Sequence, residues 1–179
     1  RLGAACEVRW DPAFRKGFLQ TTVIGGFGAT VAAARLLGLG AGQTVNALGL
    51  YHARNAGNRQ ALYDKTLAKR LQPGFAAHDA VESAFMAAAG LTGPHQALEG
   101  EAGLQRLYMN TTTQMPENWL SRRPERWQIE LVSIKRFPSC GACHPLTHAA
   151  LQLSRRERLE PADIEHVRIY LGEGGSSMV

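Results

Sequence analysis

A stretch rich in glycine and alanine, TTVIGGFGATVAAARLLG at 21–38, constrains the fold of this 179-residue chain more than any other feature. Its small side chains let helices approach closely, and Gly38 is typical of the residue that ends a helix. The chain has 19 glycines but only 13 aromatic residues (six Phe, four Tyr, three Trp). The core must therefore be built from small residues with Leu and Val. We expect a mainly α fold in which Gly26, Gly28 and Ala29 lie at a close helix contact.

Helical patterns continue through the first two thirds of the chain. The segment GQTVNALGLYHARNAG (42–57) follows the first helix, and PGFAAHDAVESAFMAAAG (73–90) is expected to be a helix that opens at Pro73 and closes at Gly90. Short turns join these segments. We therefore assign residues 1–120 to part of an all-helical domain.

The pattern changes after MPENWLSRRPER (115–126), a linker with two prolines. Alternating apolar residues in WQIELVSIKRF (127–137) and IEHVRIYLG (164–172) predict two strands, and the spacing in PLTHAALQLSRRERL (145–159) predicts a helix between them. Residues 127–179 are therefore expected to begin a smaller α+β domain.

Charge and hydropathy exclude some partners and leave others open. The net charge of +5 comes mainly from the arginine clusters at 121–126 and 154–158, and no aromatic residues alternate with them, so we read a solvated basic surface and no nucleic-acid partner. The apolar stretch at 21–34 is shorter than the roughly 20 residues of a membrane span, so no membrane partner is expected. The chain begins in what looks like the tail of a helix, so we expect a fragment of a longer protein. We also expect a cytoplasmic location.

The segment FPSCGACHP (137–145) spells C-x-x-C-H, which has several interpretations. A c-type haem also needs a second axial ligand. A thioredoxin-like dithiol needs several further strands after the motif. A zinc site needs about four ligands, so Cys6 and His148 or His166 would have to join the two cysteines. The two cysteines can equally be small buried residues at a helix start. The residues alone leave these readings open.

Three segments together resemble the MmgE/PrpD family, which includes 2-methylcitrate dehydratase, cis-aconitate decarboxylase and iminodisuccinate epimerase. They are KGFLQTTVIGGFGATVAAARLLGL (16–39), AKRLQPGFAAHDAVESAFMAAAGLTGP (68–94) and IKRFPSCGACHPLTHAALQL (134–153). The resemblance implies a large helical domain and a smaller α+β lid, with a small di- or tricarboxylate bound between them. It also implies a homodimer that uses no metal and no organic cofactor.

The resemblance also implies the site residues. Lys69 and Lys135 match the family's two lysine positions, and cations there would hold the substrate's acid groups and stabilise developing enolate charge. Cys140 falls where the family has Cys or His in a pocket loop. His144 matches a position that is commonly His and would be either a proton-transfer group or a helix-start residue, while Cys143 would be a packing residue.

One departure affects the predicted activity. Where the family usually has Gly-Phe-His, this chain has Leu19 after Gly17 and Phe18, and leucine cannot transfer a proton. Three hypotheses follow: a lyase (dehydratase or decarboxylase), an isomerase of the epimerase type using the same pocket, and a non-catalytic member of the family. The histidines at 52, 78 and 95 do not obviously replace the missing one.

Overall fold

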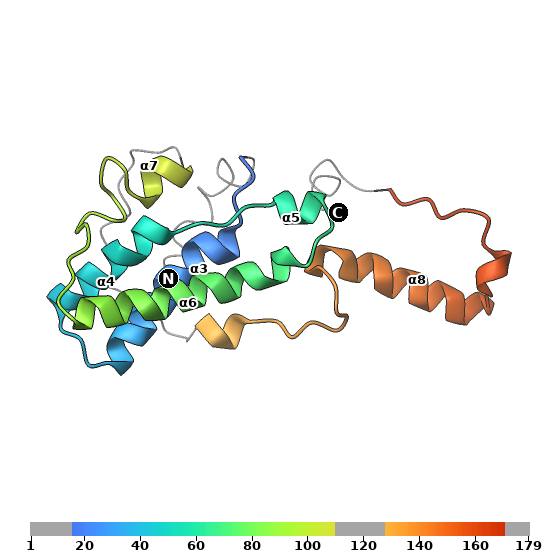
Figure 1. Cartoon of the computed structure of the whole chain (residues 1–179). Coiled ribbons are helices and arrows are strands. Elements are labelled where there is room, and N and C mark those ends of the chain that lie inside the picture. The colour runs from blue at the N-terminus through green and yellow to red at the C-terminus, as the bar shows by residue number, and fades with distance from the viewer. Residues whose placement is uncertain (1–15, 110–127, 171–179) are drawn as a thin grey trace. The chain divides into compact units, whose positions relative to one another are not determined.

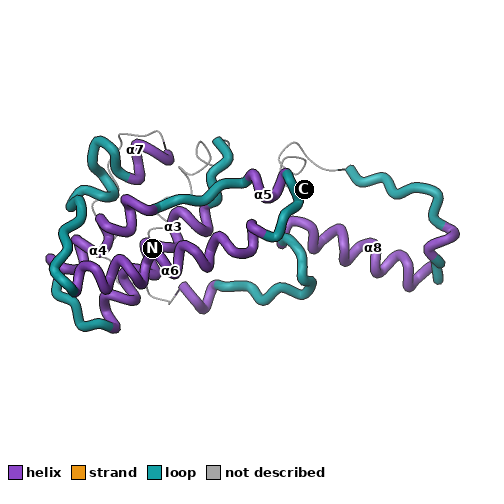
Figure 2. Tube along the Cα trace, in the orientation of Figure 1, coloured by secondary structure: helices purple, strands orange, loops and turns teal. Residues whose placement is uncertain are grey.

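The computed structural model describes residues 16–109 and 128–170. The chain divides into two compact units, 1–124 and 125–179, which we call the N-terminal and C-terminal units and describe separately. Figure 2 shows helices and connecting loops throughout the described residues and no strand. The predicted mainly α fold is therefore confirmed there. The linker at 115–126 and Cys6 lie outside the described residues.

In the described part of the N-terminal unit, the longest helices are α3 (Gln20–Leu36), α4 (Ala41–Arg54) and α6 (Ala68–Ala88). Each packs against the other two, and α6 runs along both α3 and α4 (Figure 1). Gly38 and Gly90, which follow α3 and α6, have φ of 70° and 93°. Glycine adopts this left-handed conformation without steric penalty, which explains why both helices end there.

The packing between α3 and α4 requires a glycine at position 26. A Cβ there would lie 1.8 Å from the Tyr51 hydroxyl oxygen, whereas a Cβ on Gly28 would meet nothing within 4 Å. The close helix contact predicted for Gly26 is thus confirmed, and Ala29 packs against the core. The prediction for Gly28 was wrong, because that residue lies on the exposed side of α3.

A second close approach joins α4 to the segment after α6. A Cβ on Gly49 would lie 2.4 Å from the carbonyl oxygen of Pro94, and one on Gly93 would lie 2.3 Å from that of Asn46. The Asn46 side chain accepts hydrogen bonds from the Gly93 amide (3.3 Å) and His95 Nε2 (3.1 Å). Backbone therefore packs directly on backbone here, with side-chain hydrogen bonds at its edge.

Helix α6 begins earlier than its sequence predicts. It starts at Ala68, so Pro73 lies inside it and does not open it. Proline has no N–H, so the Lys69 carbonyl cannot receive the usual hydrogen bond from residue 73. Tertiary contacts compensate: Gln72 exchanges hydrogen bonds with the backbone of Asn58, both at 2.9 Å. Packing thus extends the helix beyond what local propensity would give.

Residues 16–109 of the N-terminal unit also contain two short helices, α5 (Gln60–Tyr63) and α7 (Leu104–Met109). The buried core combines α3, α4, α6, α7 and the segment between α6 and α7. Its residues are Val23, Ile24, Phe27, Tyr51, Ala80, Ala97, Leu104, Tyr108 and Met109. The face of α6 opposite this core is apolar and exposed, at Leu67, Leu71, Phe75, Val81 and Phe85.

The described part of the C-terminal unit, residues 128–170, contains one long helix. α8 (His144–Glu157) confirms the predicted helix and follows directly on the 3₁₀ turn η2 (Gly141–Cys143). The other short elements are η1 (Gln128–Leu131) and η3 (Pro161–Asp163).

The two predicted strands are wrong for the described residues. Gln128–Leu131 is a 3₁₀ turn, and 164–170 has no regular structure. A strand is stabilised by hydrogen bonds to a neighbouring strand, and neither segment has such a neighbour within 128–170. Apolar side chains of the expected strands consequently stay exposed, with Ile134 at 98% and Ile129 at 79%.

Within the described ranges, no helix is both long enough and apolar enough to cross a membrane.

Candidate active-site segments

The segment that departs from the family pattern is fixed by backbone pairing. Phe18 and Asn58 form an antiparallel bridge, in which the Leu19 amide donates to the Gly57 carbonyl (3.1 Å) and the Arg59 amide to the Gly17 carbonyl (2.7 Å). The bridge holds the start of α3 against the loop after α4. Leu19, half-buried, therefore stands at the N-terminal boundary of α3.

A pocket of about 160 Å³ lies beside this bridge. It is lined by α3, the end of α4, the following loop and α6, through Thr22, Tyr51, Arg54, Ala56, Gly57, Asn58, Gln72, Phe75, Ala76 and Asp79. Thr22 is only 4% exposed, and its hydroxyl has no hydrogen-bond partner within the described part of the chain. The wall of the pocket therefore contains a buried, unpaired hydroxyl beside amide and charged side chains.

An ion-pair network forms one wall of this pocket. Arg54 Nη2 lies 2.7 Å from Asp79 Oδ1, and Arg54 Nη1 binds Glu82. The hydrogen bond with Glu82 is the main cause that raises the pKa of the Arg54 guanidinium. The network ties the C-terminal end of α4 to α6.

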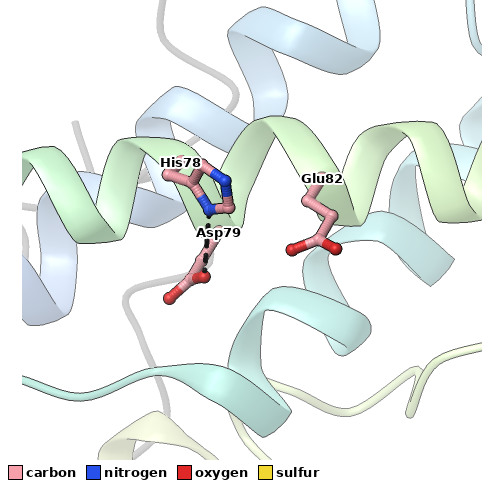
Figure 3. Close-up of side chains that lie close together, drawn as sticks. All are labelled: His78, Asp79 and Glu82. Atoms are coloured by element: carbon pink, nitrogen blue, oxygen red, sulfur yellow. Dashed lines mark ion pairs between the residues drawn. The ribbon is translucent and has the colours of Figure 1, made fainter.

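His78 adds a third potential metal ligand to the two carboxylates (Figure 3). Its Nδ1 lies 3.6 Å from Asp79 Oδ1, and one ligand atom from each of His78, Asp79 and Glu82 falls within 4.8 Å of the others. Both carboxylates are already bound by Arg54, so a cation would have to displace the guanidinium. We therefore interpret the cluster as an ion-pair network and not as a metal site.

Two buried tyrosines support the pocket from the core side. Tyr51 is 1% exposed, and its hydroxyl lies 3.1 Å from the Thr22 carbonyl and 3.2 Å from Asn55 Oδ1. Burial is the main cause that raises the pKa of Tyr51, with a contribution from the negative charge of Asp79. Burial also raises the pKa of Tyr108, which donates to the Asn55 carbonyl at 2.8 Å. Both hydroxyls therefore stay protonated and fix the loop after α4.

Lys69 lies in the first turn of α6, three residues before the pocket residue Gln72. Residues three apart on a helix are neighbours on its surface. Helical periodicity also places Lys69 on the face that carries Ala76 and Ala80, but buried packing of α6 begins only at Ala76. Lys69 is consequently exposed beyond the end of the core, next to the pocket without lining it.

The other three predicted site residues lie in one short segment of the C-terminal unit. Lys135 Nζ donates to the Ser139 carbonyl at 3.0 Å, and Cys140 is exposed at the start of η2. His144, half-buried, is the first residue of α8, and its Nε2–H donates to the Phe137 carbonyl at 3.1 Å. In a neutral imidazole, Nδ1 then keeps the lone pair that could accept a proton. Hydrogen bonds thus hold Lys135 and His144 around one loop.

A family model, the MmgE/PrpD N-terminal domain, matches residues 2–116. The chain belongs to the MmgE/PrpD family. It is similar to the human (Homo sapiens) cis-aconitate decarboxylase, with 32% identity over 142 residues, 78% of this chain and 28% of that relative. It is also similar to the cis-aconitate decarboxylase-like protein oryM of Aspergillus oryzae, with 26% identity over 145 residues, 78% of this chain and 30% of that one. The chain thus spans under a third of the length of these curated relatives.

Membership of the MmgE/PrpD family does not by itself place the predicted residues together. Lys69 belongs to the N-terminal unit, and Lys135, Cys140 and His144 to the C-terminal unit, so a pocket shared by the two lysines stays a prediction. None of His52, His78 and His95 lines the pocket beside Leu19. His52 instead donates from Nε2 to the Ala102 carbonyl at 2.8 Å.

Sequence reasoning missed the polar residues of the pocket, above all Arg54, Asn58 and Gln72. A signal was present in RNAGNRQ (54–60), a run of polar residues and glycine directly after a helix. Such runs usually form solvated loops, so the sequence alone does not identify these residues as pocket residues. Only the hydrogen bonds between Gln72 and the Asn58 backbone show that the run packs against α6.

Proposed function

We propose that this chain is part of a lyase of the MmgE/PrpD type that removes carbon dioxide or water from a small di- or tricarboxylate without a metal or organic cofactor. Membership of the family supports the proposal. Two relatives support it as well: one is named a cis-aconitate decarboxylase and the other a cis-aconitate decarboxylase-like protein. The matches to these relatives extend over 78% of the chain, well beyond the matched N-terminal domain.

The chemistry of polycarboxylates explains the roles we assign. Loss of carbon dioxide or of water passes through enolate-like charge, which a nearby cation stabilises. We assign that role, and the binding of the acid groups, to Lys69 and Lys135. Amide donors of the pocket, on Asn58 and Gln72, would bind the remaining oxygens. His144 would move the proton through Nδ1, with Cys140 beside it.

The test is calorimetric binding of cis-aconitate to the product of the complete open reading frame that contains this sequence. An ammonium group about 4 Å from a carboxylate contributes about 4 kcal/mol at an effective dielectric constant of about 20, and competition from water reduces this gain. We expect Lys69→Ala and Lys135→Ala each to weaken binding by about 10- to 100-fold. Arg70→Ala, at the next position of α6, is the matched control and should bind like the wild type. Equal affinity of wild type and both lysine variants would refute the assignment.

Leu19 favours a second candidate, an isomerase of the epimerase type or a non-catalytic carboxylate-binding member. Without the usual histidine, fewer groups can move a proton at the start of α3. Solvent deuterium incorporated into recovered substrate, with no carbon dioxide or water released, would identify the isomerase. Binding with neither reaction would identify the non-catalytic member.

The homodimer implied by the resemblance and the expected cytoplasmic location also remain proposals. Light scattering of the complete protein tests the first, and fractionation of the source cells tests the second.

A further inference from the structure

We propose that Cys140 and Cys143 form a reactive dithiol, a modification site at which a low-molecular-weight disulfide such as oxidised glutathione produces an intramolecular disulfide. Both cysteines are free thiols in the structure. The proposal concerns the C-terminal unit alone and does not depend on the proposed lyase activity.

The backbone between the two cysteines forms a turn that keeps their Cα atoms close. The Cys143 amide donates to the Cys140 carbonyl at 2.9 Å, which closes a single turn from residue 140 to residue 143. Ends of such a turn lie within about 7 Å, Cα to Cα, and disulfides join Cα atoms about 4.4–6.8 Å apart. The bond can therefore form by side-chain rotation, without refolding of the segment.

The two thiols differ in accessibility, and this difference gives each its role. Cys140 is exposed, whereas Cys143 is partly buried at the junction of η2 and α8. An external disulfide can therefore reach the sulfur of Cys140 first. Cys143, protected from direct attack but one turn away, is placed to displace the bound group.

The surroundings of Cys140 leave its side chain free to react. Cys140 precedes η2 with extended backbone angles (φ −60°, ψ 138°), and its side chain makes no capping hydrogen bond to the turn. Gly141, which follows it, has open space where a Cβ would stand. On the other side, Lys135 holds the Ser139 carbonyl at 3.0 Å and fixes the approach to the turn. The thiol is thus presented on an ordered backbone without being tied itself.

The reaction balances in two exchange steps. The Cys140 thiolate attacks one sulfur of oxidised glutathione, the sulfur–sulfur bond of glutathione breaks, and one glutathione leaves as a thiolate that takes up a proton. The Cys143 thiolate then attacks the Cys140 sulfur and releases the second glutathione in the same way. The protein loses two protons and two electrons, and one glutathione disulfide is reduced to two thiols.

The experiment uses the complete protein carrying Cys6→Ser, so that no exchange involves the third cysteine of this chain. Any cysteine that the complete protein has outside these 179 residues is changed to serine as well. The native protein is incubated with oxidised glutathione, blocked with an alkylating reagent and digested with trypsin. Cleavage after Arg136 and Arg155 leaves both cysteines in one peptide, 137–155. We expect this peptide to lose two hydrogen atoms and to resist alkylation until it is reduced.

Single substitutions test the two roles. Cys143→Ser should trap glutathione on Cys140 as a stable mixed disulfide, whereas Cys140→Ser should acquire at least about tenfold less glutathione in the same time, because Cys143 is partly buried. Circular dichroism checks that each variant keeps its helical content. A wild-type peptide that remains fully alkylated would overturn the proposal. Equal glutathione adducts on the two single variants would overturn the assignment of roles, and so would an adduct on Cys143 alone.

Discussion

Replacement of Gly26 by alanine tests the close helix contact on which the N-terminal unit is built. The added Cβ would lie 1.8 Å from the Tyr51 hydroxyl oxygen and 2.0 Å from its ring carbon Cζ. Ordinary contacts are longer than about 3 Å, so the Tyr51 ring must move by more than about 1 Å. The ring cannot do so freely, because it packs edge-on against Phe27 with centroids 5.0 Å apart and its hydroxyl is held at the Thr22 carbonyl.

The free energy of unfolding should fall by about 1–3 kcal/mol in Gly26→Ala. Overpacking of this kind costs about 1–3 kcal/mol, and a lost hydroxyl hydrogen bond adds about 1 kcal/mol. The higher helix propensity of alanine offsets about 1 kcal/mol. Gly28→Ala, in the same helix but with open space at its Cβ, is the matched control. It should stabilise the protein by about 0.5–1 kcal/mol, since only the propensity term applies.

Thermal unfolding of both variants, followed by far-ultraviolet circular dichroism, decides between these signs. A change of 1 kcal/mol shifts the melting temperature by roughly 2–4 °C in a chain of about 150–250 residues. The cost of Gly26→Ala should also shrink when Tyr51 is replaced by leucine, because the clash is with the ring. The reasoning fails if Gly26→Ala melts at or above the wild-type temperature, or if its cost is unchanged in the Tyr51→Leu background.

Three further predictions follow from the same unit. Gly49→Ala should lower the free energy of unfolding by about 3 kcal/mol, at the upper end of overpacking costs. The added Cβ would meet the Pro94 backbone at 2.4–2.5 Å, and backbone cannot rotate away as a side chain can. An equilibrium urea titration that shows a loss below about 1 kcal/mol would contradict this prediction. Wild-type stability should decrease above about pH 10 by about 1.4 kcal/mol per pH unit for each tyrosine that stays protonated only when folded. Because the pKa of buried Tyr51 is raised above its ordinary 10.0, the folded chain keeps a proton that the unfolded chain loses. Tyr51→Phe should therefore reduce the loss of stability per pH unit, measured by urea titrations above about pH 10. An equal loss per pH unit in wild type and Tyr51→Phe would contradict the role given to Tyr51. Arg54→Gln should lower the free energy of unfolding by no more than about 1 kcal/mol, since Arg54 and its partner Glu82 are both partly exposed. High salt should reduce this loss, and a loss that high salt leaves unchanged would contradict a purely electrostatic role for the network.

The helices of the N-terminal unit could be predicted because their signals are local. Small residues, apolar periodicity and the stops at Gly38 and Gly90 lie within a few residues of the structure they produce. Which glycine faces a neighbour is not local: Gly26 and Gly28 have the same composition around them, and only the position of Tyr51 distinguishes them. The early start of α6 at Ala68 depends in the same way on a contact with Asn58.

The strand predictions failed for a related reason. Alternating apolar residues give a segment the capacity to pair, but the pairing itself needs a second strand that the segment does not encode. Residues 128–137 and 164–170 have no partner strand in the described part of the chain. The lysines of the candidate site were reached only through the family resemblance, because an exposed lysine such as Lys69 gives no local signal. The pocket residues Arg54 and Asn58 were missed because polar loops are usually solvated.

Product analysis of the complete protein with cis-aconitate tests the proposed lyase most directly. Carbon dioxide release and nuclear magnetic resonance of the organic product follow the reaction, with Lys69→Ala and Lys135→Ala measured beside the wild type. We expect wild type to release carbon dioxide, or to add or remove water, and both lysine variants to lose this activity at unchanged melting temperatures. A folded wild type that binds cis-aconitate yet changes neither it nor other small di- and tricarboxylates would contradict the proposal.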